Sequence, residues 1–230
     1  MDFLKIDGDT TYLLPYNLQN QLHRTVVANH KSWSNITELP DYLFDVFTKQ
    51  MRTECNVVNE RFTFPPETGP KVIIEESGFT KTIRIDSDHS MRGALHYRNC
   101  FAVMAYFAGI HGKKIKPVCE RGVYKFTDEQ LILLGISTRY AMMPPKYIKK
   151  IYLLTQMSLH DDNAKNDKSF LRSFVDNLSF QAEVPEWVAV SRLQEHAIAS
   201  NEFADVISRR SVEDLVERYR KHEHYRDPLV

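Results

Sequence analysis

The most apolar stretch of the chain, residues 98–112, predicts a buried helix at the centre of the fold. Small residues recur along it at helical spacing, so one side of the helix is thin and a second element can approach it closely. These small residues are Ala102, Ala105, Ala108 and Gly109. A membrane-spanning helix needs about 20 apolar residues, so this stretch is too short to be one. We therefore expect a central helix from about Ser90 to His111 that ends at Gly112, in a protein with no membrane partner.

Shorter patterns before this helix predict a helix and several strands. An apolar face at helical spacing starts near Pro40, and proline suits the first position of a helix. Apolar and polar residues then alternate from Phe79 to Ile85, which is typical of a half-buried strand. Residues 61–64 and 72–74 are further candidate strands. We expect these strands to form a small antiparallel sheet packed on the central helix.

The second half of the chain predicts helices only. A capping box at residues 127–130 begins a helix that stops at Pro144, and residues 147–157 have an amphipathic helical pattern. The polar run 161–168 has no periodicity and predicts an exposed linker. Three short helices are expected beyond it, over residues 170–178, from Pro185 and from Ser211.

Together these patterns predict an α+β fold that is mostly helical, with the small antiparallel sheet packed on the central buried helix. Residues 1–160 should form the core, and residues 161–230 a helical C-terminal part packed on it. The chain is 43% hydrophobic and 26% charged, so it can bury a sizeable core. Thirty basic residues balance thirty acidic ones. This balance argues against a dedicated nucleic-acid coat or a membrane-surface protein.

The cysteines indicate the compartment. Cys55, Cys100 and Cys119 are odd in number and never form a CxxC motif. This usage favours reduced thiols over a disulfide framework or a zinc ribbon. The first residues carry acidic side chains and lack the apolar segment of a secretory signal. We therefore expect a cytoplasmic protein.

Four local patterns, taken in order, point to a known family. A strand ends at residues 83–86, and the central helix after it ends in Ile-His-Gly at 110–112. The next helix ends in Ala-Met-Met-Pro at 141–144, and VPEWVAVSRL follows at 184–193. In this order the patterns resemble the ImmA/IrrE metallopeptidase family, over roughly residues 37–200. The resemblance implies a peptidase-like domain with a helical C-terminal part.

The chain departs from that family at the metal site. The family carries HEXXH on its central helix and a third ligand, a glutamate, on the next helix. We align the Ile-His-Gly ending and Pro144 on their family counterparts. The positions of the lost metal site then hold Val103, Met104, Phe107 and Leu131. Zinc needs three N, O or S ligands, and activating water needs a carboxylate beside them. We therefore expect a pseudo-enzyme with no catalytic residue, metal or cofactor of the family type.

The function predicted on this basis is a non-catalytic regulatory or protein-interaction module. Members of the family commonly act on repressors carried by phages and mobile elements. The resemblance therefore implies a regulator from such an element, which binds a repressor or a host factor without cutting it.

Two alternatives come from other parts of the chain. The C-terminal helices could bind DNA as a regulator, and their possible phosphate contacts are Arg192, Arg209 and Arg210. An enzyme could instead use a metal or thiol site outside the family pattern, and its candidate residues are His89, His96, His111 and Cys100. Acidic residues interleave with the C-terminal arginines, and a mixed face of this kind is usually only solvated. A buried free cysteine is more often a small hydrophobic residue than a nucleophile.

Overall fold

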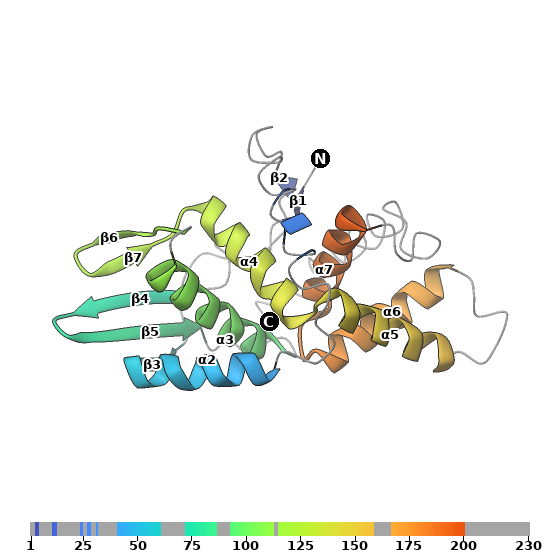
Figure 1. Cartoon of the computed structure of the whole chain (residues 1–230), viewed down its shortest axis with the longest axis horizontal. Helices are drawn as coiled ribbons and strands as arrows, with labels where there is room; N and C mark the ends of the chain where they lie inside the picture. Colours follow the sequence, from blue (N-terminus) through green and yellow to red (C-terminus); the bar gives the residue numbers. More distant parts are fainter. Residues whose placement is uncertain are drawn as a thin grey trace, which may run out of the picture.

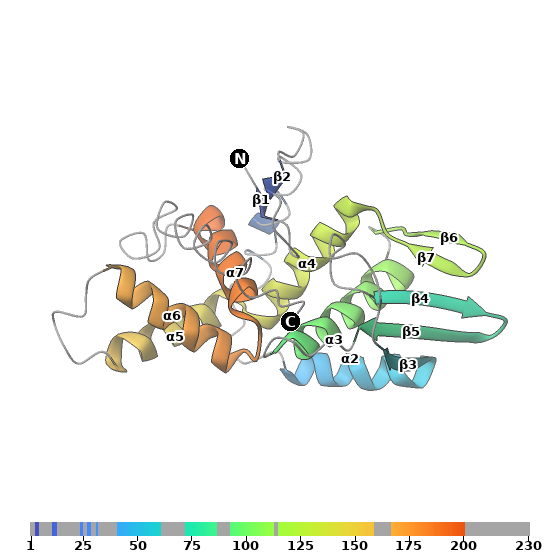
Figure 2. The same ribbon diagram turned by 180° about the vertical axis from the view of Figure 1, so that it is seen from behind.

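The computed structural model describes residues 3–4, 11–12, 24, 27–28, 31, 41–60, 72–86, 93–112, 115–158 and 167–200. Within these ranges the protein has the predicted α+β fold. The main sheet lies at one end of the molecule and helices α5 and α6 lie at the other, as Figures 1 and 2 show from opposite sides. A separate two-stranded pair, β1 (Phe3–Leu4) and β2 (Thr11–Tyr12), is antiparallel.

Five strands of the described ranges form the main sheet, in the order β3-β5-β4-β7-β6. They are β3 (Cys55–Glu60), β4 (Val72–Ser77), β5 (Thr80–Asp86), β6 (Val118–Glu120) and β7 (Val123–Lys125). Strands β4 and β5 form an antiparallel hairpin whose turn contains Gly78 with φ +61°. A positive φ favours glycine at this position.

The sheet differs from the expected one at its β3 edge. Strand β3 pairs with β5 in parallel, with Val57 opposite Ile83, so the sheet is mixed and not purely antiparallel. The difference arises because β3 pairs with the second strand of the β4–β5 hairpin and not with the first. Strand β3 was not predicted, and the prediction of helices only in the second half of the chain is wrong for β6 and β7. The candidate strand at residues 61–64 lies outside the described residues.

The central helix lies against the sheet. It begins as α3 (Ala94–Met104), continues as the π-helix η1 (Ala105–His111) and ends at Gly112, as predicted. Helix α3 packs on β4 and β5 and on helix α2 (Asp41–Glu54), which leads directly into β3. The π-helical stretch was not predicted, because the apolar pattern does not distinguish π from α geometry.

The remaining helices extend the core away from the sheet. They are α4 (Asp128–Met142), α5 (Pro145–Ser158), α6 (Asp167–Gln181) and α7 (Glu186–Ala199). The predicted capping box begins α4, where the Thr127 hydroxyl accepts from the Gln130 backbone and the Gln130 side chain accepts from the Thr127 backbone. Helix α4 packs on α3 and α7, while α6 packs on α5 and α7.

The main hydrophobic core crosses the expected boundary at residue 160. It runs from Phe44 in α2 to Leu193 in α7 and includes residues of α3, α5 and α6. Most of the expected linker at 161–168 and the helix expected from Ser211 lie outside the described residues. In the parts of the chain that the structure describes, no helix is long and apolar enough to cross a membrane.

Candidate functional site

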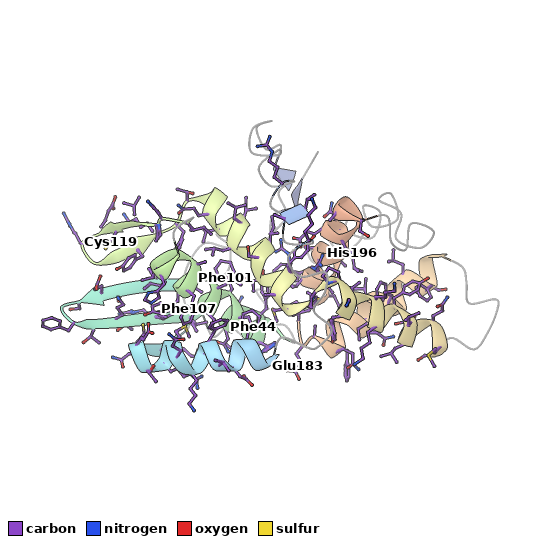
Figure 3. All side chains as sticks on the ribbon, viewed as in Figure 1. Phe44, Phe101, Phe107, Cys119, Glu183 and His196 are labelled. Carbon is purple, nitrogen blue, oxygen red and sulfur yellow. The ribbon has the colours of Figure 1, made fainter. Side chains whose placement is uncertain are left out.

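The side chains at the aligned metal positions of the central helix are packed against other apolar groups. Val103 is 2% exposed and belongs to the main core. Phe107 is partly buried against the same core, and its ring centroid lies 5.1 Å from that of Phe47 in α2. Figure 3 shows Phe107 on the central helix between the sheet and α2.

Met104 and Leu131 both pack against a second, smaller apolar cluster. This cluster is built on buried Phe101, Ala105 and Leu134, and both Met104 and Leu131 pack against it. Met104 also contacts the main core, whereas Leu131 does not. Val103, Met104 and Phe107 therefore share the main core, and Leu131 shares only the second cluster with Met104.

The thin side of the central helix is occupied by an aromatic ring. A Cβ atom added to Gly109 would lie 2.5 Å from Cε1 of Phe126, which is closer than atoms pack in proteins. The prediction that small residues let another element approach this helix is confirmed at Gly109. The described residues contain no group of three histidine, cysteine or acidic side chains that could hold a metal ion.

The structure brings together two of the four alternative site residues. His96 Nε2 and Cys100 Sγ are 4.0 Å apart, one turn apart on α3. Cys100 is 3% exposed, so a substrate in solvent has no direct access to its thiol. His111 lies at the far end of η1, about three helical turns beyond Cys100. His89 lies outside the described residues.

A polar cluster that was not predicted joins the end of α2 to η1. The Tyr106 hydroxyl donates to Glu54 Oε2 at 2.5 Å, and His111 Nε2 lies 3.1 Å from the same oxygen. These hydrogen bonds, that of Tyr106 first, lower the pKa of the Glu54 carboxyl. Burial and the neighbouring Cys55 and Glu54 raise the pKa of Tyr106. Because 52 residues separate Glu54 from Tyr106, no local sequence signal connects them.

A buried ion pair joins α4 to α7. Arg139 Nε donates to Glu195 Oε1 at 2.7 Å, a second guanidinium nitrogen contacts the same oxygen, and Arg139 Nη1 lies 3.4 Å from the Tyr97 hydroxyl. Both charged side chains are buried. Burial by itself lowers the pKa of Arg139, but the Glu195 carboxylate outweighs this effect and raises it. The guanidinium therefore stays charged inside the protein.

Arg192 lies beside this pair and is not at the surface. It is 0% exposed, its Nε donates to the Met143 carbonyl at 2.8 Å, and its guanidinium carbon lies 3.5 Å from the centre of the Tyr140 ring. The prediction that Arg192 contacts a phosphate is wrong for this position, because a side chain without exposed surface cannot reach a nucleic-acid backbone. The arginine faces inward because α7 packs that side on α4. Arg209 and Arg210 lie outside the described residues.

Comparison of the chain with known protein families, with curated proteins and with solved structures found no match. The resemblance to the ImmA/IrrE family therefore stays a prediction from the sequence patterns. The same holds for the implied partner, the phage or mobile-element origin and the cytoplasmic localisation.

Proposed function

We propose that this chain is a non-catalytic regulatory or protein-interaction module. One observation carries the proposal: the central helix is surrounded by packed apolar side chains where an ImmA/IrrE-type peptidase would hold its metal. Val103 is buried in the main core, and Met104 and Leu131 pack in the second cluster. Close packing of this kind stabilises a scaffold, and it supports a structural role for this part of the helix.

The resemblance supports a particular kind of partner. Because the family commonly acts on repressors of phages and mobile elements, the partner of a member without metal ligands is a repressor or a host factor. Binding without cleavage requires a surface and no reactive group. The proposed compartment is the cytoplasm, where the three cysteines would stay reduced.

Capture of a partner tests the interaction. The full chain, carrying a tag, is the bait in a bacterial cytoplasmic extract, with chemical cross-linking before capture and with the tag alone as the control. We expect one specific protein to be recovered in an amount comparable to the bait. Recovery of the same background proteins by the bait and by the tag alone would contradict the proposal.

Metal content tests the non-catalytic part. The protein is purified without chelators, and its zinc content is measured by mass spectrometry. We expect zinc far below one atom per chain. A stoichiometric zinc that disappears when His96 or His111 is replaced by alanine would overturn the proposal and favour an enzyme with a metal site outside the family pattern.

A thiol enzyme is the second candidate, because His96 and Cys100 are neighbours on one helix face. An imidazole beside a thiol is the arrangement that activates a cysteine nucleophile. The candidate requires the buried Cys100 thiol to become accessible. Iodoacetamide should therefore modify Cys100 as fast as the exposed Cys119 if the site is catalytic, and far more slowly if it is structural. The DNA-binding alternative is weakened, because Arg192 is buried and cannot contact a phosphate.

A further inference from the structure

Helix α5 presents its outer face at the end of the molecule opposite the sheet (Figure 1). Its inner face is held firmly, because Tyr147, Ile148, Ile151 and Thr155 are buried and α6 packs beside it. The outer face is therefore held in position by the packing of the inner face.

The outer face carries a regular stripe. Lys146, Lys150, Leu153 and Met157 are all exposed, and they are separated by four, three and four residues. This spacing places side chains in one line along a helix and is the spacing by which helices pack on one another. Leu153 is 47% exposed and Met157 is 70% exposed, and Leu154, also 47% exposed, lies beside them. Three large apolar side chains on adjacent turns are more than the scattered exposure that is normal for a surface.

The charge on α5 is one-sided. The helix sequence PKYIKKIYLLTQMS contains three lysines and no acidic residue, whereas the whole chain has a net charge of zero. Lysines occupy the first half of the stripe, and apolar side chains occupy the second half. A complementary surface therefore carries acidic groups at one end and apolar groups at the other.

The α5 helix of a second copy does not supply that surface. In a parallel pairing of two α5 helices, Lys146 and Lys150 would face the same lysines of the other copy. In an antiparallel pairing, Lys146 would face Met157 and Lys150 would face Leu153. Either arrangement leaves the lysines without an acidic partner, because α5 contains none.

A membrane surface also fits less well than a protein. Helices that lie in a membrane interface present a broad apolar face with basic residues along its sides. On α5 the apolar side chains occupy only the last two turns of the outer face, and the lysines precede them along the helix axis. A helix of another protein can match this change from lysines to apolar side chains along the axis of α5, because its own side chains can change in the same way.

We propose that the stripe of Lys146, Lys150, Leu153 and Met157 is the docking site for an amphipathic helix of a partner protein. The partner helix carries apolar residues opposite Leu153 and Met157, and aspartate or glutamate opposite Lys146 and Lys150. The proposal rests on the proposed function and specifies the surface that the interaction uses. Helix-on-helix binding of this type depends on a few anchors at helical spacing.

Two synthetic peptides test the chemistry of the site. The first is a helical peptide whose binding face carries leucine in one half and glutamate in the other half. The second peptide has lysine in place of each glutamate. Binding of each labelled peptide to the full chain is measured by fluorescence anisotropy. We expect the acidic peptide to bind at least about tenfold more tightly than the basic one.

Matched variants locate the binding. We expect the double variant Leu153→Asp, Met157→Asp to weaken binding of the acidic peptide at least about tenfold, and Lys146→Glu, Lys150→Glu to reverse the preference between the two peptides. The controls are Phe79→Asp at the tip of the β4–β5 hairpin and Lys49→Glu on α2, two exposed positions away from the stripe. Both controls should bind as the wild type does. Thermal unfolding of each variant confirms that these exposed substitutions leave the fold intact.

Several outcomes would overturn the docking proposal. These are equal binding of the two peptides, wild-type binding by both stripe variants, and binding of phosphatidylserine vesicles without binding of the acidic peptide. A sedimentation dimer that the stripe variants abolish would identify a second copy as the occupant. The capture experiment separates this proposal from the proposed function. If a stripe variant still captures the partner, the interaction module stands and its site lies elsewhere. If the acidic peptide binds but no partner is captured, the stripe stands as a site for acidic helices and the proposed interaction module is contradicted.

Discussion

The surroundings of α3 and the contact between α4 and α7 are both fully buried, but they are built from different side chains. Around α3 the buried groups are Phe101, Ala102 and Val103, which contact other apolar residues. Between α4 and α7 they include Arg139 and Glu195, which contact each other. Figure 3 shows the labelled Phe101 on α3 and His196 on α7, one in each region.

The two regions should respond differently to substitution. Apolar burial is non-directional and roughly proportional to the area removed from water, so a changed shape removes only part of the stabilisation. A buried ion pair is different, because loss of one partner leaves the other charged and unpaired in the protein interior. A change of shape around α3 should therefore cost less stability than the removal of one charge from the α4–α7 contact.

The largest effect should follow from Arg139→Met. The substitution leaves Glu195 buried without its partner, and breaking a buried pair in this way costs about 3–5 kcal/mol of the free energy of unfolding. Urea unfolding followed by circular dichroism measures the loss. The double variant Arg139→Met, Glu195→Leu should recover most of it, because no charge is then left unpaired. A loss below about 1 kcal/mol for the single variant would contradict the role assigned to the pair.

A smaller effect is expected from Gly109→Ala on the thin side of the central helix. The added Cβ would lie 2.5 Å from Cε1 of Phe126, and overpacking of a core costs about 1–3 kcal/mol. Alanine recovers about 1 kcal/mol of helix propensity, so we expect a net loss near 1 kcal/mol. In a Phe126→Leu background the ring is absent and the same substitution should become stabilising. Urea unfolding of the four chains of this cycle measures both signs, and an unchanged loss in the Phe126→Leu background would contradict the packing explanation.

Most of the helices were predictable because their signals are local. The capping box at Thr127 and Gln130, the stop at Pro144 and the small residues around Gly109 each lie within one or two turns of the structure they specify. The alternation from Phe79 to Ile85 likewise predicted β5 directly. Such signals depend only on neighbouring residues: the periods of helices and strands, a capping side chain, or a proline.

The pairings over long sequence distances were not predictable in the same way. The parallel pairing of β3 with β5 depends on which strand of the hairpin lies beside it, and periodicity carries no information on this choice. Glu54 meets Tyr106 across 52 residues, and Arg139 meets Glu195 across 56. The inward orientation of Arg192 was missed for the same reason, because charged residues are normally exposed and only the contact with α4 shows that this one is not.

The next prediction concerns Glu54, which contacts Tyr106 and His111 in a partly exposed polar cluster at the edge of the α3 region. The hydrogen bonds from Tyr106, Gln50 and His111 lower the pKa of Glu54. A carboxyl with a lowered folded-state pKa contributes stability above its unfolded-state pKa, and this stability is lost as the pH falls through the folded-state pKa. We therefore expect the urea concentration at the unfolding midpoint of the wild type to decrease as the pH is lowered below about 4.5, the ordinary pKa of glutamate.

The matched variants separate Glu54 from the other carboxylates. In Glu54→Gln the unfolding midpoint should decrease less steeply at acid pH than in the wild type. In Asp45→Asn, a substitution at an exposed position on the same helix, it should decrease as in the wild type. Urea unfolding midpoints between pH 3 and pH 7 give both profiles. Identical profiles for the wild type and Glu54→Gln would contradict the assigned role of the cluster.

The smallest effect is expected from Arg192→Met, which compares two arginines within one region. Arg192 is as buried as Arg139, but its Nη1 and Nη2 atoms have no hydrogen-bond partner among the described residues. Removing it loses the hydrogen bond to Met143 and the contact with the Tyr140 ring, but it also removes the desolvation of a charge that no carboxylate neutralises directly. We therefore expect a loss below about 1 kcal/mol in urea unfolding, several times smaller than that of Arg139→Met. Equal losses for the two variants would show that the α4–α7 contact depends on its total positive charge, and not on the single pair between Arg139 and Glu195.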